Sequence, residues 1–150
     1  MPKVTHEQVK LMLQLYEMRR EPRMREARDW YFSSFRPTSL DDMQKQAPMG
    51  SPQNASMRMV ISYWEMAASI VNRGLIDEAF FFENTGEQWV VWERLRALVP
   101  ALRERSKNPH QYGNLEKHVK RLEAWREKRA PGSTNAMRQM MAQMAPPPSR

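Results

Sequence analysis

The side chains best placed for chemistry form a polar line within a long apolar segment. Four residues recur at intervals of four, three and four positions, which puts them on one face of a helix: Arg58, Ser62, Glu65 and Ser69. If this face lies inside a bundle, Glu65 needs a cationic or hydrogen-bonding partner, because an unpaired buried charge is costly. Such a carboxylate could bind a ligand or act as a base with a raised pKa. The competing interpretation, which we favour, is a face that is solvent-exposed or paired with arginines.

Other kinds of reactive site find no support in the residue types. The sequence has no cysteine, which excludes disulfides, thiol catalysis and thiolate-bound metals. The three histidines, His6, His110 and His118, do not have a metal-binding spacing such as H-E-x-x-H, so we predict no metal site and no cofactor. No glycine-rich phosphate loop and no G-x-S-x-G motif is present. We assign no catalytic residue and rank an enzyme below binding functions.

Charge is distributed unevenly along the 150 residues, which carry +7 in total. The net charge is +3 over residues 1–36, −5 over residues 37–93 and +9 over residues 94–150. Either these parts pack against one another, or the basic part attracts nucleic acid or another polyanion. The candidate anion-binding residues are Arg94, Arg103, Lys117, Lys120, Arg121 and Lys128. No named nucleic-acid-binding module is recognisable among them.

Apolar periodicity and end signals predict helices along most of the chain. Thr5 begins a T-x-x-Q capping box, and a stripe at helical spacing follows it: Val9, Met12, Leu13 and Tyr16. Pro22 ends or kinks this helix, a second helix extends to about residue 35, and residues 37–53 form a connector. Ser51-Pro52 then begins a long helix over about 53–73, which Gly74 ends. This helix is apolar on most sides, so we place it at the centre with Trp64 in the core.

Residues 75–93 allow two interpretations. The apolar runs within 79–92 could form a β-hairpin with a five-residue loop. We favour helices, because a second T-x-x-Q box at Thr85 leads into helical spacing that continues to Arg105, with a kink at Pro100. A further helix is predicted over about 115–129.

The chain ends in a methionine-rich segment, residues 133–150, which we separate from a bundle domain over residues 1–132. Met is adaptable at contact surfaces, and four methionines share one helical face as candidate partner-docking residues: Met137, Met140, Met141 and Met144. This segment is too short to be stable as an isolated helix, so it docks or stays disordered. Three consecutive prolines from Pro146 end any helix there.

Part of the sequence resembles a known family. A Trp-acid-x-x-Ala core at Trp64–Ala68 is followed by Gly74-Leu75-Ile76-Asp77, Phe81-Phe82, and Trp89 to Trp92-Glu93-Arg94. Over roughly residues 5–125 the chain resembles the bacterial domain of unknown function 4760 family. The resemblance implies an all-helical fold and brings no established reaction. Some relatives carry an N-terminal transmembrane helix, whereas no run of about 18 apolar residues occurs in this sequence.

The sequence therefore predicts an all-α protein, a single bundle of five to six helices around the segment 53–73. Its expected function is a non-catalytic interaction or structural role, as an oligomer or as a subunit of a larger assembly. The alternative is a basic protein that binds nucleic acid or ribosomes. Because no signal-peptide pattern follows Lys3, we expect a cytoplasmic location.

Overall fold

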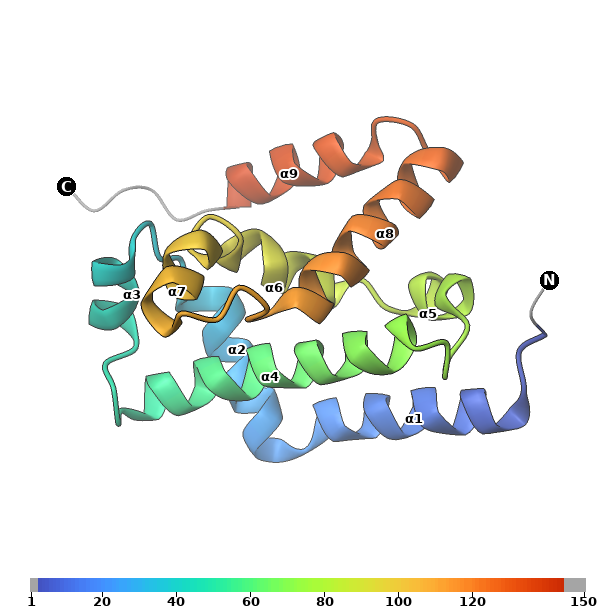
Figure 1. The fold of residues 1–150 in the computed structure, drawn as a ribbon, viewed down its shortest axis with the longest axis horizontal. Helices are drawn as coiled ribbons and strands as arrows, with labels where there is room; N and C mark the ends of the chain where they lie inside the picture. The colour runs from blue at the N-terminus through green and yellow to red at the C-terminus, as the bar shows by residue number, and fades with distance from the viewer. Residues whose placement is uncertain (1–2, 145–150) are drawn as a thin grey trace.

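The computed structural model describes residues 3–144, and this part of the chain contains nine helices and no strand (Figure 1). The predicted all-α class is confirmed. In chain order the helices are α1 (His6–Arg20), α2 (Pro22–Ser34), α3 (Leu40–Gln46), α4 (Pro52–Asn72), α5 (Glu78–Asn84), α6 (Glu87–Leu95), α7 (Val99–Ser106), α8 (Gly113–Arg129) and α9 (Ser133–Met144).

Side-chain caps and turn residues set the ends of the first helices. The hydroxyl of Thr5 accepts the Gln8 backbone N–H at 3.2 Å, as one half of the capping box predicts, whereas the Gln8 side chain accepts the Asp77 N–H. Glu21 alone separates α1 from α2, and its carboxylate accepts the Met24 N–H at 3.0 Å. Ser51 caps α4 in the same way, and Gly74 ends it with a φ of +78°, which favours glycine.

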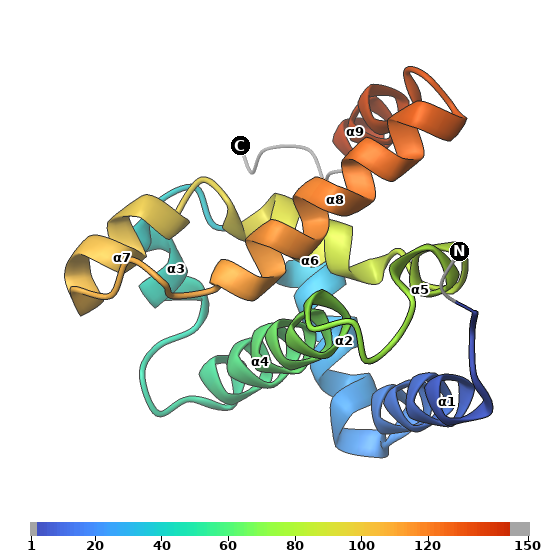
Figure 2. The same ribbon diagram turned by 45° about the vertical axis from the view of Figure 1, so that its right-hand side comes forward.

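Helix α4 lies at the centre of the molecule. Figures 1 and 2 show α2 passing behind it and α8 starting beside it and running away at an angle, and α4 makes its most extensive contacts with these two helices. Trp64 is 1% exposed, in agreement with its predicted place in the core. Around it, the other helices contribute large buried side chains that include Tyr31, Phe81 and Trp89.

The segment 75–106 is helical but is divided differently from our prediction. A hairpin at 79–92 is excluded, because α5 and α6 occupy these residues. Gly86, not Thr85, is the N-cap of α6, and the Gln88 side chain donates to the Thr85 hydroxyl at 3.0 Å. The predicted kink at Pro100 is wrong: the chain breaks at 96–98, and Pro100 stands in the first turn of α7, where its missing N–H costs nothing.

The apolar stripe predicted for α1 faces the core only in part. Of the stripe, Val9 and Met12 are half-buried, whereas Leu13 and Tyr16 are 52% and 48% exposed; the buried residue of α1 is Leu15, outside the stripe. Figure 1 shows α1 along one side of α4, at the edge of the molecule. A helix at an edge can bury only one part of a wide apolar surface, so the remainder of the stripe faces outward.

Helices α8 and α9 form the opposite side of the molecule. Helix α8 packs on α4 and α6, and α9 folds back from its C-terminal end (Figures 1 and 2). None of the helices described by the structure is both long and apolar enough to cross a membrane.

Candidate functional site

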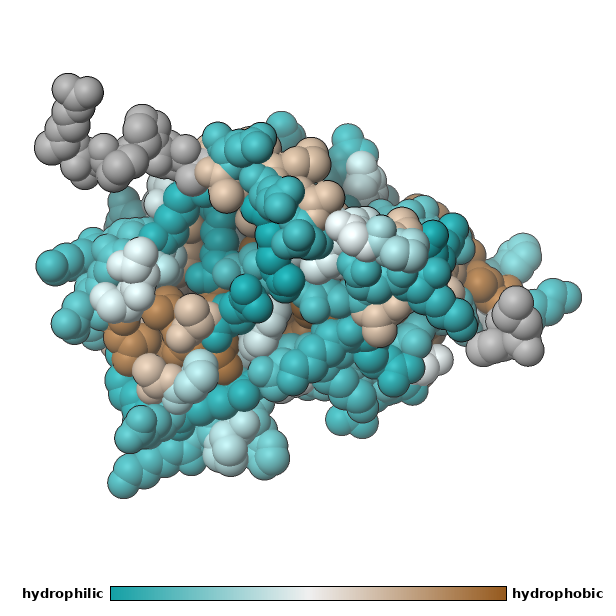
Figure 3. Space-filling model, turned by 90° about the horizontal axis from the view of Figure 1, so that it is seen from above, coloured by the Kyte–Doolittle hydropathy of each residue, from teal (hydrophilic) through white to brown (hydrophobic). Residues whose placement is uncertain are grey.

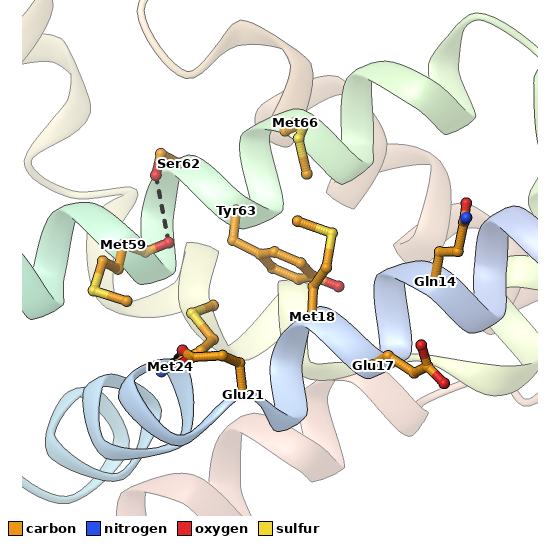
Figure 4. Close-up of a pocket in the computed structure, with 9 residues that line it drawn as sticks. All are labelled: Gln14, Glu17, Met18, Glu21, Met24, Met59, Ser62, Tyr63 and Met66. Carbon is orange, nitrogen blue, oxygen red and sulfur yellow. Dashed lines mark hydrogen bonds between the residues drawn. The ribbon is translucent and has the colours of Figure 1, made fainter.

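A groove of about 930 Å³ lies between α1 and α4 (Figure 4). Figure 4 shows Met18 from α1 and Met66 from α4 extending into the space between the two helices, beside the ring of Tyr63. Four of the nine lining residues are methionines, and the full set is Gln14, Glu17, Met18, Glu21, Met24, Met59, Ser62, Tyr63 and Met66. The groove is therefore mainly apolar, with adaptable walls.

Polar contacts fix α1 against the rest of the protein at several points. The Tyr63 hydroxyl donates to the carbonyl oxygen of Leu15, and burial raises the pKa of Tyr63 to about 12, so the hydroxyl remains a donor at neutral pH. The guanidinium carbon of Arg19 lies 5.3 Å from the Trp64 ring centroid. Near the other end of α1, the Gln8 side chain accepts the Asp77 N–H at 2.9 Å. These contacts hold α1, one wall of the groove, in place against the rest of the protein.

The charged residues that line this groove are both carboxylates, Glu17 and Glu21. Neither forms an ion pair within the described residues. Further exposed apolar side chains stand nearby on α1, since Leu13 and Tyr16 line a smaller hollow of about 210 Å³ on its other side. One polar-line residue, Ser62, lines the groove, but sequence reasoning missed the groove itself.

Glu65, the centre of the predicted polar line, caps another helix. Its two carboxylate oxygens accept the backbone N–H groups of Asn114 at 3.1 Å and Leu115 at 2.7 Å, in the first turn of α8. Negative charge is favourable there, because the helix N-terminus carries free N–H groups and a positive partial charge. Arg58 and Ser62 are exposed and Ser69 is half-buried. The line therefore contains a helix cap, and no ion pair to Glu65 occurs in residues 3–144.

The six candidate anion-binding residues are spread over three helices and most have partners. Arg103 and Lys120 both pair with Glu116, at 3.6 and 3.8 Å, and Arg121 forms a two-pronged contact with Glu78 at 2.6 and 2.7 Å. Lys117 and Lys128 are exposed on α8. The face of α8 and α9 is predominantly hydrophilic, with smaller apolar areas (Figure 3).

Arg94, the remaining candidate of this set, points inward. Its guanidinium donates to the carbonyl oxygens of Tyr31 and Phe35 at the C-terminal end of α2. Free carbonyls at that end carry a negative partial charge, which a cation stabilises. Arg94 therefore connects α6 to α2 and does not share the surface of the α8 cations.

The four candidate docking methionines lie on α9, which is held against the bundle. Met137 and Met141 pack on the core, whereas Met140 and Met144 are 60% and 77% exposed. Arg138, between them, contacts Glu93 and Glu123, each at 2.9 Å. Residues 133–144 are therefore a docked helix, and Pro146 lies outside the described residues.

A partly buried cluster around Glu87 was not apparent from the sequence. Its carboxylate contacts Arg28 at 2.7 Å and Arg19 at 3.6 Å, and it accepts the indole N–H of Trp64 at 3.0 Å. The hydrogen bond to Glu87 raises the pKa of Arg28. Four helices meet in this cluster. Because each of its polar groups has a partner, we interpret the cluster as a structural contact.

The one buried histidine of the described residues, His118, likewise has a structural role. His118 is 1% exposed, stands edge-on to Phe81 and Phe82, and lies 3.2 Å from the Gln88 amide nitrogen. Burial lowers its pKa to about 4, so the ring is neutral near pH 7. Across residues 3–144, no three histidine or carboxylate side chains are grouped to hold a metal ion.

Comparison with known proteins agrees with the resemblance noted in the sequence. A family model described as a domain of unknown function, DUF4760, matches residues 4–122, which include the groove and helices α1 to α7. Neither curated proteins nor solved structures gave a significant match. Because the matched region covers most of the 150 residues, the chain belongs to the domain of unknown function 4760 family.

Proposed function

We propose that this protein is a non-catalytic interaction module whose groove between α1 and α4 binds an apolar, positively charged helix of a partner protein. The observation that carries the proposal is the composition of the groove, which combines four methionines with Glu17 and Glu21. Binding of an amphipathic helix in an apolar groove is a common recognition mode. Methionine suits it, because its flexible thioether adapts to different apolar side chains.

Charge defines the partner further. Lysine and arginine outnumber aspartate and glutamate by 24 to 17 in the chain, yet the groove lining within residues 3–144 has carboxylates and no cation. A partner helix with lysine or arginine beside its apolar face would place these cations near Glu17 and Glu21. Opposite charge at an interface speeds association and disfavours wrong partners. The groove therefore repels nucleic acid, whose phosphates carry negative charge.

The alternative, binding of nucleic acid or ribosomes, would use the surface of α8. Pairing of Arg103, Lys120 and Arg121 with carboxylates reduces the charge available there. Lys117 and Lys128 remain exposed, and an interaction through them would be unspecific and sensitive to salt. We also propose a cytoplasmic location, which imaging of a fluorescent fusion would test.

The test uses two synthetic helical peptides, one with leucines and lysines on opposite faces and the other with leucines and glutamates. Fluorescence anisotropy should show binding of the leucine–lysine peptide and not of its acidic counterpart. Glu17→Lys should weaken binding about tenfold or more, because like charges then face each other. Met66→Glu, which puts a charge in the apolar wall, should abolish it. Glu26→Lys, an exposed change on α2 outside the groove, is the matched control.

Four results would contradict the proposal. Equal affinity for both peptides, or equal weakening by Glu17→Lys and Glu26→Lys, would show that the groove does not select its ligand. Concentration-dependent dimerisation that Met66→Glu abolishes would identify a second copy as the occupant. Salt-sensitive binding of labelled duplex RNA, reduced by Lys117→Glu and unaffected by Met66→Glu, would favour the alternative function.

A further inference from the structure

Another hollow, of about 450 Å³, lies between α2, α6 and α9. Its volume is within the ~300–1,000 Å³ typical of small-molecule sites. Two arginines line it, Arg36 just after α2 and Arg94 on α6. Apolar side chains form much of the remaining wall: Phe32, Val90, Met141 and Met144. Among the described residues, the hollow shares no lining residue with the groove between α1 and α4.

The two arginines lack the carboxylate partners that other arginines of this protein have. Within residues 3–144 no carboxylate oxygen lies within 4.0 Å of either guanidinium. Arg94 donates to backbone carbonyls, and Arg36 reaches the Phe32 carbonyl at 3.4 Å. The Nε atom of each arginine is buried and has no acceptor among the described residues. Two cations therefore stand together with hydrogen-bonding capacity to spare.

The nearest carboxylate in the lining does not compensate for these charges. Glu87 makes a bidentate contact with Arg28, at 2.7 and 3.1 Å, and also contacts Arg19. Burial and the positive charge of Arg36 lower the pKa of Arg94, as expected where one cation stands near another without an anion. A bound anion would relieve this repulsion and accept the free N–H groups.

The apolar wall restricts the anion to an amphiphile. The guanidinium carbon of Arg94 lies 5.7 Å from the centroid of the Phe32 ring, so the charged end of the hollow adjoins its apolar end. Met141 and Met144 belong to α9, which is anchored one turn earlier by Arg138. An alkyl chain could lie along Phe32, Val90 and these flexible methionines while its head group meets the arginines.

We propose that this hollow binds a monomeric alkyl carboxylate, with the carboxylate at Arg36 and Arg94 and the chain between α2, α6 and α9. The site requires a negative head and an apolar tail together. Inorganic anions lack the tail, and neutral or cationic amphiphiles lack the head. The proposal is independent of the groove between α1 and α4.

The experiment titrates the full chain with decanoate, decanol, decylammonium and acetate, each below its aggregation limit. Calorimetry should show the tightest binding for decanoate and none for acetate or decylammonium. From hexanoate to decanoate the affinity should rise about fourfold per methylene, which follows from the free energy of burying a CH₂ group. Arg36→Gln should weaken decanoate binding about tenfold or more through loss of a charge-assisted contact. Arg25→Gln, an exposed change on α2 outside the hollow, should leave it unchanged.

Methyl NMR of labelled methionines locates the ligand without any substitution. Decanoate should shift the methyl signals of Met141 and Met144, while those of Met18, Met59 and Met66 stay in place. Shifts confined to the latter three, or equal affinity for decanoate and decylammonium, would overturn the proposal. So would unchanged binding by Arg36→Gln. Cosedimentation with phosphatidylglycerol vesicles in the absence of decanoate binding would point to a membrane surface instead and would also overturn it.

Discussion

Replacement of Trp64 by alanine should be among the most destabilising single changes in this protein. The side chain is 1% exposed at the middle of α4, and its ring stands edge-on to the Tyr63 ring, with 5.0 Å between the ring centroids. Removal of a buried tryptophan costs about 3–5 kcal/mol through lost burial and the cavity left behind. The indole N–H also donates to Glu87, so Trp64→Ala removes one partner of a partly buried carboxylate. This adds about 1–3 kcal/mol unless water replaces the indole.

Urea unfolding followed by far-ultraviolet circular dichroism measures this cost. Trp64→Phe separates the two contributions, because it keeps most of the ring volume and loses the donor; we expect about 1–3 kcal/mol for it. Trp125→Ala is the control: Trp125 is only partly buried on α8, so its replacement should lower the free energy of unfolding less. An unchanged slope against urea would show that the same surface unfolds in each variant. If Trp64→Ala cost no more than Trp125→Ala, the central position of α4 would be refuted.

Three further predictions follow from side chains with one dominant contact. Glu65→Ala should cost about 0.5–2 kcal/mol in urea unfolding, because it removes the cap of α8, and hydrogen exchange should increase first at Asn114 and Leu115. Because burial lowers the pKa of His118 to about 4, the unfolded state binds a proton below about pH 6.5 while the folded state does not. The free energy of unfolding should therefore be highest near pH 7 and fall by roughly 3 kcal/mol towards pH 4. His118→Gln should lose this pH dependence. Arg138→Gln should speed hydrogen exchange in α9 and change global stability by only about 1 kcal/mol or less, because the Arg138 side chain is itself 35% exposed and solvent screens its ion pairs; equal acceleration in α4 would contradict this.

Local signals in the sequence predicted the ends of the helices well. Thr5, Ser51 with Pro52, and Gly74 act on their own segments, and each performs the predicted role. Pro100 shows the limit of such reasoning: proline is compatible with either a kink or a first helical turn, and the break at 96–98 depends on how α6 and α7 pack.

The candidate sites were harder to predict, because their partners are distant in sequence. Glu65 was expected to need a partner only if its face lay inside the bundle, and the favoured partners were solvent or arginines; its partners are backbone N–H groups about 50 residues away, which no spacing rule identifies. The groove depends on the placement of α1 at an edge of the molecule. Its only sequence signal was the pair Glu17 and Glu21, four residues apart around Met18, which would have been compatible with an ordinary exposed helix face.

The cluster around Glu87 has a consequence for the order of folding. Most contacts in a helical protein are local and form early, but Glu87 lies 59 residues from Arg28 and 23 from Trp64. Its carboxylate is compensated only after α2, α4 and α6 have come together, so we expect the cluster to form after the folding transition state. Replacement of Glu87 by glutamine should then accelerate unfolding and leave the refolding rate nearly unchanged. The Glu87 carboxylate would therefore slow unfolding, because its contacts hold helices from both halves of the chain together after they have packed.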